Sequence, residues 1–196
     1  MFDVQGFILV GGASRRMGRD KAQLTLEGQT FVDRIGHELS AVASSVSLVG
    51  ARQEFAGYRN MPDVYEHWGA LGGIHGALTA ARGWAVVVAC DLPFVTSELI
   101  ERLKTFAGDT TDAVVPIQPD GRPQPVCALY RRSTCLPEID KLIAAGEHTP
   151  RALLAKVQTR YVQVAELSDL AGAENFFFNV NTPEDLQAAE RMLAQH

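Results

Sequence analysis

Two short runs in this chain are apolar on both faces, and this feature constrains the fold more than any other. Phe7-Ile8-Leu9-Val10 and Ala85-Val86-Val87-Val88 show no alternation with polar residues. A strand without a polar face must be covered on both sides, as helices cover the central strands of a parallel sheet. The pattern therefore predicts an α/β fold built on a buried, mostly parallel sheet.

Other strand-length apolar runs alternate with stretches of helical periodicity, which is typical of a three-layer Rossmann-like sandwich. Asp120-Gly121 lies between two extended runs and indicates a hairpin, so we expect a mixed sheet with some antiparallel pairing. The expected strands are residues 6–10, 46–49, 85–89, 113–117, 126–130 and 161–164, and the expected helices are residues 31–43, 97–106 and 183–194.

Length, charge and cysteine usage exclude several classes of protein. The 196 residues, 46% of them hydrophobic, suit one folded domain over residues 1–196. A net charge of −5 argues against a nucleic-acid partner or an anionic membrane surface. No apolar run approaches the roughly 20 residues that cross a bilayer, and no signal peptide is evident. Three cysteines without a CxxC pair predict reduced thiols and a cytoplasmic protein, and the histidines lack zinc-ligand spacing.

The segment that follows the first expected strand combines glycines with positive charge. Glycines let the backbone approach a ligand and point several N–H groups at anionic oxygens. Ligands of open parallel sheets bind beyond the carboxyl ends of the strands, so this segment suits a triphosphate. Its spacing fits neither a P-loop nor a dinucleotide-binding loop, and a solvated basic turn is the alternative. The glycines are Gly11, Gly12 and Gly18, and the cations are Arg15, Arg16, Arg19 and Lys21.

The same segment carries a resemblance to a known family. Leu9-Val10-Gly11-Gly12-x-Ser14-x-Arg16-Met17-Gly18-x-Asp20-Lys21 resembles the signature of nucleotidyltransferases with a glycosyltransferase-A-like fold. The ending from Arg16 to Lys21 is most similar to the molybdenum cofactor guanylyltransferases. Cys90-Asp91-Leu92-Pro93 and the stretch 178–186 match the same family. The matches extend over almost the whole chain, which favours a full-length relative.

The resemblance implies a reaction and roles for the residues of the loop. The family transfers GMP from GTP to the molybdenum-molybdopterin cofactor and releases diphosphate, with Mg²⁺ as the expected cofactor. Lys21 and Arg16 would then neutralise phosphate charge, with Lys21 the best candidate for stabilising the transition state. Asp91 would hold the metal, because a carboxylate at the end of an apolar strand is costly unless it is compensated. A turn or helix-capping role for Asp91 is the alternative.

Further positions are assigned to substrate binding by the same resemblance. The backbone of Gly11 and Gly12 would cradle the phosphates, and Asp63 would line the nucleotide site together with a glycine-rich loop over residues 69–73. Asn179 and Asn181 would face the molybdopterin, and Arg151 lies where the family carries basic residues. Ordinary turn chemistry is the alternative for Asp63 and Asn181, and a plain surface position is the alternative for Arg151.

One stretch departs from the family pattern. Guanylyltransferases of this type commonly carry an asparagine just after the second long strand, but Leu48-Val49-Gly50-Ala51-Arg52 contains none. The readout of guanine would need other groups, such as Asp63 and backbone atoms of Leu9, Val10 and the glycines that follow.

Alternatives to the guanylyl reaction therefore stay open. One is the same chemistry with CTP and molybdopterin, or with a sugar or alditol phosphate. Another is a nucleotide-binding partner protein without turnover. We expect the nucleotide to bind residues 1–110 and the acceptor to bind residues 111–196. We further expect a monomer or weak oligomer, with molybdoenzyme-maturation proteins as candidate partners.

Overall fold

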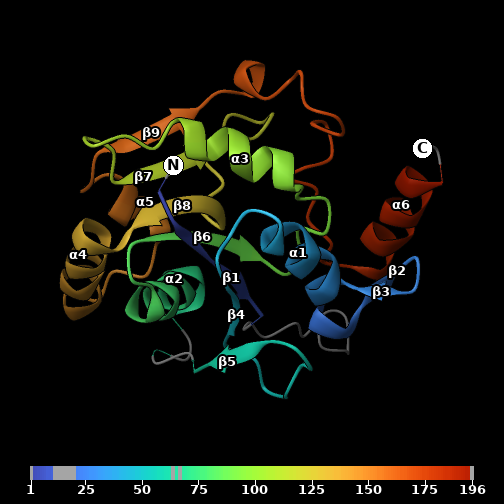
Figure 1. Ribbon diagram of the computed structural model, residues 1–196, viewed down its shortest axis with the longest axis horizontal. Helices are drawn as coiled ribbons and strands as arrows, with labels where there is room; N and C mark the ends of the chain where they lie inside the picture. Colours follow the sequence, from blue (N-terminus) through green and yellow to red (C-terminus); the bar gives the residue numbers. More distant parts are fainter. Residues whose placement is uncertain (1, 11–20, 63–64, 66–67, 195–196) are drawn as a thin grey trace.

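The centre of the molecule is a seven-stranded sheet with helices on both faces (Figure 1). The structure, a computed structural model, describes residues 2–10, 21–62, 65 and 68–194. Of the seven strands only β8 runs antiparallel to its neighbours, so the sheet is mixed but mostly parallel, as expected. The strand order is β5 (Arg59–Met61), β4 (Val46–Val49), β1 (Val4–Leu9), β6 (Trp84–Ala89), β8 (Cys127–Arg131), β7 (Ala113–Pro116) and β9 (Thr159–Val162).

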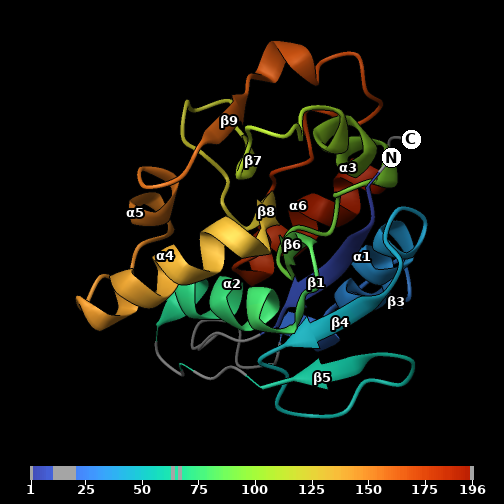
Figure 2. The ribbon, with the colours of Figure 1, turned by 60° about the vertical axis from the view of Figure 1, so that its left-hand side comes forward.

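The helices form two layers and one outlying element. Helices α1 (Phe31–Ser40) and α3 (Ser97–Thr105) cover one face of the sheet. Helices α2 (Gly69–Ala80), α4 (Arg132–Ala144) and α5 (Pro150–Leu154) cover the other, where α2 and α4 lie side by side (Figure 2). Helix α6 (Pro183–Leu193) packs beside the hairpin of β2 (Thr25–Leu26) and β3 (Gln29–Thr30). Two 3-10 turns in the described residues are η1 (Lys21–Gln23) and η2 (Val164–Glu166). None of the helices in the described part of the chain is long and apolar enough to span a membrane.

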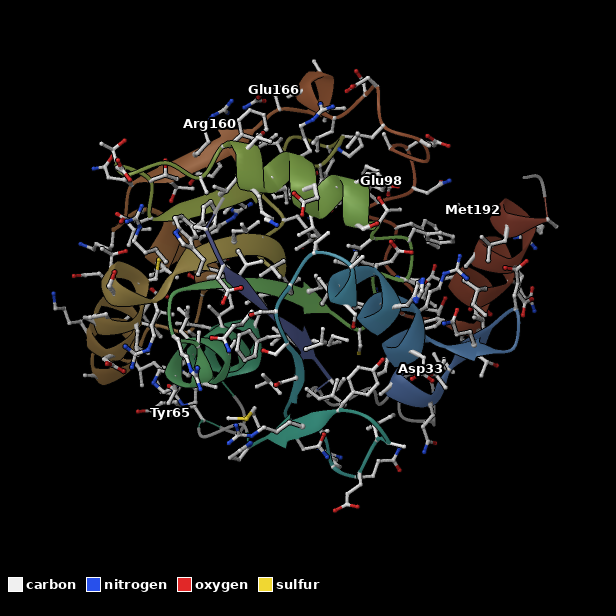
Figure 3. All side chains as sticks on the ribbon, in the orientation of Figure 1. Asp33, Tyr65, Glu98, Arg160, Glu166 and Met192 are labelled. Atoms are coloured by element: carbon white, nitrogen blue, oxygen red, sulfur yellow. The ribbon has the colours of Figure 1, made fainter. Side chains whose placement is uncertain are left out.

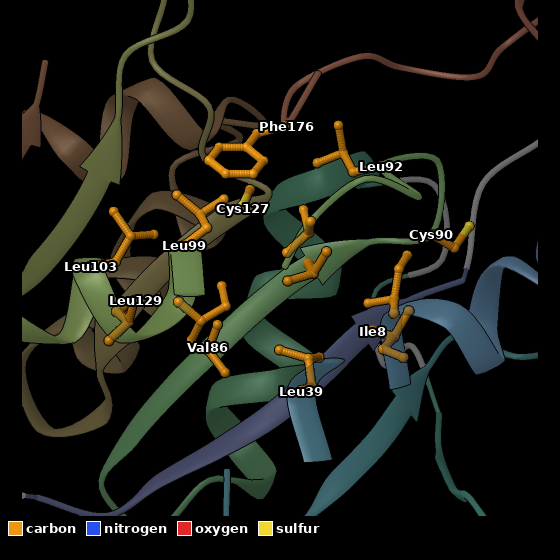
Figure 4. Close-up of a cluster of buried hydrophobic side chains, with 14 of the residues drawn as sticks. Ile8, Leu39, Val86, Cys90, Leu92, Leu99, Leu103, Cys127, Leu129 and Phe176 are labelled. Carbon is orange, nitrogen blue, oxygen red and sulfur yellow. The ribbon is translucent and has the colours of Figure 1, made fainter. Parts of the chain in front are cut away.

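The position of strand β6 explains why its sequence lacks a polar face. Val86 and Val88 belong to the core under α1 and α3, whereas Ala85 and Val87 belong to the core under α2 and α4. Figure 4 shows the first of these cores, where Phe176 from the C-terminal part of the chain packs close to strand and α3 side chains. The prediction of a sheet buried on both faces is confirmed.

The expected elements agree closely with the observed ones, with one clear error. All six expected strands and all three expected helices are present, and Ile117 bridges Pro123 in the expected hairpin. The expected glycine-rich loop over residues 69–73 is wrong, because these residues form the first turns of α2. Glycine is needed there for packing: a Cβ on Gly73 would lie 3.0 Å from the Leu9 side chain, and one on Gly76 would lie 2.9 Å from Val49. Helices α4 and α5 and strands β2 and β3 were not expected.

A glycine in α1 gives a direct test of packing. A Cβ on Gly36 would lie 2.0 Å from the Tyr58 hydroxyl oxygen, so alanine there must displace the ring. We expect Gly36→Ala to lower the free energy of unfolding by about 1–2 kcal/mol, because overpacking outweighs the helix propensity gained. Denaturant unfolding measures the change. Gly83→Ala is the matched control, since its Cβ would meet nothing within 4 Å. In a Tyr58→Ala background Gly36→Ala should cost nothing, and a stabilised Gly36→Ala single variant would contradict the packing argument.

Candidate active site

Three segments that are distant in the sequence meet at the carboxyl end of the central strands. The backbone N–H of Cys90 donates to the carbonyl of Leu9 at 3.0 Å, and that of Val10 donates to Val49 at 3.0 Å. The N–H of Val180 donates to the carbonyl of Asp91 at 2.9 Å. The structure thus brings the predicted positions Leu9, Val10 and Asp91 together with the segment that carries the two predicted asparagines.

The remaining predicted positions lie partly outside the described residues. Gly11, Gly12, Arg16 and Asp63 fall outside them, and only the backbone of Lys21 is described. That backbone opens η1, the 3-10 turn that precedes the β2–β3 hairpin.

Asp91 lies in a tight turn after β6 and is half-buried. The N–H of Leu92 donates to the carbonyl of Ala89 at 3.1 Å, and the Leu92 side chain is fully buried. Helix α3 has Thr96 as its cap, so the helix-capping alternative for Asp91 is wrong, whereas the turn alternative agrees with the structure. The turn places Asp91 at the sheet edge where ligands of such folds bind.

The two predicted asparagines flank a buried valine. Asn179 and Asn181 are half-buried, while Val180 is fully buried. The amide nitrogen of Asn179 donates to the carbonyl of Phe177 at 3.2 Å. The backbone N–H of Asn181 donates to the Asp185 carboxylate at 2.9 Å, within the cap of α6. Asn181 therefore adjoins the helix cap, as the turn-chemistry alternative expected, while both residues stay beside the Asp91 turn.

A small apolar cluster connects η1 and the hairpin that follows it with the asparagine segment. The sequence did not predict this cluster. Val180 packs in a cluster with the hairpin and with α6, and the N–H of Phe31 donates to the carbonyl of Leu24 at 2.9 Å. The β2–β3 hairpin and α6 therefore fix η1 and the asparagine segment relative to each other. The cluster residues are Leu24, Leu26, Phe31, Val180 and Ala189.

The cysteines near the strands do not offer a nucleophile. Burial raises the pKa of Cys127 to about 12, and burial raises that of Cys135 to about 12 as well. Cys90 is buried in the core, as a small apolar residue.

Among the described residues no group of three or more His, Cys, Asp or Glu side chains could hold a metal ion. A single carboxylate such as Asp91 fits Mg²⁺ held mainly by substrate phosphates and water.

Helix α5 carries the remaining basic position that the sequence singled out. Arg151 is exposed in the first turn of α5, so the structure leaves it a surface residue whose role stays a prediction.

The sheet edge that lacks the family's asparagine carries another asparagine on the next strand. Asn60 of β5 pairs with Leu48 of β4. Its amide nitrogen donates to the carbonyl of Gln53 at 2.8 Å, which closes the loop between the two strands. Within the described part of the chain its buried amide oxygen has no hydrogen-bond partner. The sequence gave no reason to single out Asn60, because it lies outside every motif.

The solved structures that resemble this chain define its class. Molybdopterin-guanine dinucleotide biosynthesis protein A from Archaeoglobus fulgidus superposes with a TM-score of 0.84 at 29% identity, over 98% of this chain and 100% of that one. The 2-C-methyl-D-erythritol 4-phosphate cytidylyltransferase from Thermus thermophilus shares the fold, with a TM-score of 0.69 at 18% identity over 98% of this chain and 100% of that one. The chain thus has the nucleotidyltransferase fold, of the glycosyltransferase-A-like type.

Sequence comparison narrows the class to a family. A family model described as a MobA-like NTP transferase domain matches residues 6–164. A probable molybdenum cofactor guanylyltransferase from Pelotomaculum thermopropionicum is 36% identical, over 100% of this chain and 96% of that protein. The chain belongs to the MobA-like NTP transferase family, and it is an enzyme of the nucleotidyltransferase class, as the resemblance in its motifs implied.

Proposed function

We propose that this enzyme transfers GMP from GTP to the molybdenum-molybdopterin cofactor, with release of diphosphate. The observation that carries the proposal is the meeting of the Leu9–Val10 strand end, the Asp91 turn and the asparagine segment at one sheet edge. The names of its relatives support the choice of substrates. A phosphate oxygen of molybdopterin attacks the α-phosphorus of GTP, and the bond to the diphosphate leaving group breaks.

The chemistry requires mainly positioning and charge neutralisation, because negative charge grows on the leaving diphosphate. In this proposal Lys21 and Arg16 neutralise that charge, and the backbone of Gly11 and Gly12 cradles the phosphates. Asn179 and Asn181 contact the acceptor. The hydrogen bond between Val180 and Asp91 supports this division, because it joins the acceptor segment to the nucleotide side of the site.

Mg²⁺ is the cofactor that fits the donor set. Asp91 is half-buried, and its carbonyl is engaged by the Val180 N–H, so the turn is fixed while the side chain is the metal ligand we propose. When bound, the ion would neutralise phosphate oxygens and orient the triphosphate. Asp63 is the second acidic position that we assign to the nucleotide site.

The direct test is diphosphate release by the purified protein with GTP, Mg²⁺ and molybdopterin. We expect diphosphate only when all three are present, and stoichiometric formation of the guanine dinucleotide. GTP hydrolysis without an acceptor, or no diphosphate under any condition, would contradict the proposal. GTP binding that ignores EDTA and yields no product would favour a binding protein without turnover.

Base choice is the open part of the proposal, because residues 50–52 lack the family's asparagine. The second candidate is therefore the same transfer from CTP. Thermal shift with each of the four NTPs and Mg²⁺ ranks the bases, since a ligand at 100 times its Kd adds about 2.7 kcal/mol. We expect GTP to give the largest shift.

The remaining assignments follow from this function. We propose a cytoplasmic enzyme whose nucleotide binds residues 1–110 and whose acceptor binds residues 111–196. A monomer or weak oligomer that meets molybdoenzyme-maturation proteins would suit the delivery of the finished cofactor.

A further inference from the structure

An aromatic stack at the amino-terminal end of α2 has no role in the proposed function as described so far. The indole of Trp68 and the imidazole of His148 lie face to face, with ring centroids 3.8 Å apart and an interplanar angle of 23°. Trp68 immediately precedes α2, and His148 lies between α4 and α5. Trp68 is half-buried and His148 is exposed. The stack therefore sits at the surface and joins two distant parts of the chain.

The indole is held from behind by a chain of ring contacts. The ring centroids of Tyr65 and Trp68 lie 6.0 Å apart in a T-shaped arrangement, and those of Tyr65 and His75 lie 4.8 Å apart, also T-shaped. The His75 ring is buried, and its Nε2 lies 3.1 Å from an Asp140 carboxylate oxygen on α4. Figure 3 shows Tyr65 beside α2, below the helix. These contacts hold the indole in place, so it gives fixed support to the His148 ring that stacks on it.

The imidazole that stacks on the indole comes from an exposed turn. Gly146 adopts a positive φ of 78°, which reverses the chain after α4. The Thr149 N–H donates to the Glu147 carboxylate at 2.9 Å, and this bond lowers the pKa of Glu147. His148 thus lies between Glu147 and Thr149, which are joined by this hydrogen bond, and its ring packs against the indole. Because His148 is exposed, its ring forms the solvent side of the stack and the indole backs it.

The stack lies beyond the carboxyl ends of the parallel strands. A Cβ on Gly73 would touch Leu9, the last residue of β1, so Gly73 marks the level of the strand ends. Trp68 directly precedes α2, so it lies further out than Gly73, on the side beyond the strand ends. Ligands of open parallel sheets bind in this region.

We infer that a fused heteroaromatic ring stacks on the exposed His148 ring, which the Trp68 indole supports. This inference rests on the proposed function, because the guanine of GTP and the pterin of the acceptor both carry such a ring. Planar rings of this size gain affinity by stacking on aromatic side chains, and removing one such contact weakens binding by about 5- to 150-fold.

The test is isothermal titration calorimetry with GTP and Mg²⁺ in one arm and a stable pterin monophosphate in the other. Trp68→Leu removes the π face, whereas Trp68→Phe keeps one. We expect Trp68→Leu and His148→Ala to weaken one arm by about 5-fold or more, and Trp68→Phe to retain most of the affinity. Trp84→Phe is the matched control, because Trp84 lies at the amino end of β6 under the Arg131 guanidinium.

The outcomes separate the stacking site from the proposed function. Weakened GTP binding assigns the stack to guanine, and weakened pterin binding assigns it to the acceptor. Unchanged affinity of Trp68→Leu for both ligands, at an unchanged melting temperature, overturns the stacking site even if the enzyme forms diphosphate normally. Binding that depends on Trp68 in a protein that never forms diphosphate would instead overturn the proposed function alone.

Discussion

Lys21→Ala is expected to reduce the turnover of GTP by about 10²- to 10³-fold, the loss typical of removing one preorganised group that stabilises transition-state charge. The substitution removes a cation from the start of η1 and leaves its apolar anchors in place. Ala22 is fully buried, and Leu24 and Leu26 pack in the cluster with α6. The fold should therefore tolerate the change, and GTP binding should weaken less than turnover. Diphosphate release and GTP affinity, measured side by side, check the prediction.

A surface lysine provides the control for this variant. Lys156 is exposed after α5, and Lys156→Ala removes the same charge at a position we assign to no site. It should leave turnover unchanged. Lys21→Arg should restore part of the rate, since a guanidinium keeps the charge but not the compact ammonium geometry. Wild-type turnover in Lys21→Ala would show that the transition state does not depend on this residue.

The strands were predictable because their signal is local. A run such as residues 85–88 can be buried on both faces only in the middle of a covered sheet, whatever the rest of the chain does. The ends of the expected strands accordingly differ from the observed ones by only a few residues. The carboxyl ends of these strands then predicted where the site should lie.

Helix α2 was not predictable by the same reasoning, because glycine lowers helix propensity by about 1 kcal/mol per residue. Tertiary packing decides the outcome there. Gly73 and Gly76 let the helix approach Leu9 and Val49 closely, and neither contact is visible in the sequence. Helix α4 had a weak signal in the spacing of Cys135, Ile139 and Ile143, with Pro137 inside the helix to obscure it.

The residues of the candidate site came from motifs, but their contacts did not. The resemblance assigned roles to Asp91 and to the asparagine segment separately, and the hydrogen bond from Val180 that joins them spans nearly half of the chain. The Trp68–His148 stack left no trace in any motif, because its partners lie in separate segments that only folding brings together. Long-range pairing of this kind depends on the topology of the sheet.

Asp91→Asn is the second substitution with a large expected effect. We expect turnover to fall by about 10²- to 10³-fold, because a metal that neutralises phosphate oxygens contributes several kcal/mol to transition-state stabilisation. We also expect Mg²⁺ to lose its effect on GTP affinity. Calorimetric titration of GTP at increasing Mg²⁺ gives a readout that does not depend on catalysis: the affinity of the wild type should rise with the ion, and that of Asp91→Asn should stay flat.

The structure lets this variant separate metal binding from folding. Asp91 is tied to the acceptor segment through its backbone carbonyl, which accepts from the Val180 N–H at 2.9 Å. Asparagine keeps that carbonyl and nearly the same side-chain shape, so the turn and the melting temperature should be preserved. Asp109→Asn, in an exposed loop after α3, removes a carboxylate remote from the site and should change neither turnover nor the Mg²⁺ dependence. If Asp91→Asn kept the full response to Mg²⁺, the ion would have to be held by other groups, and the role of this carboxylate in the site would be wrong.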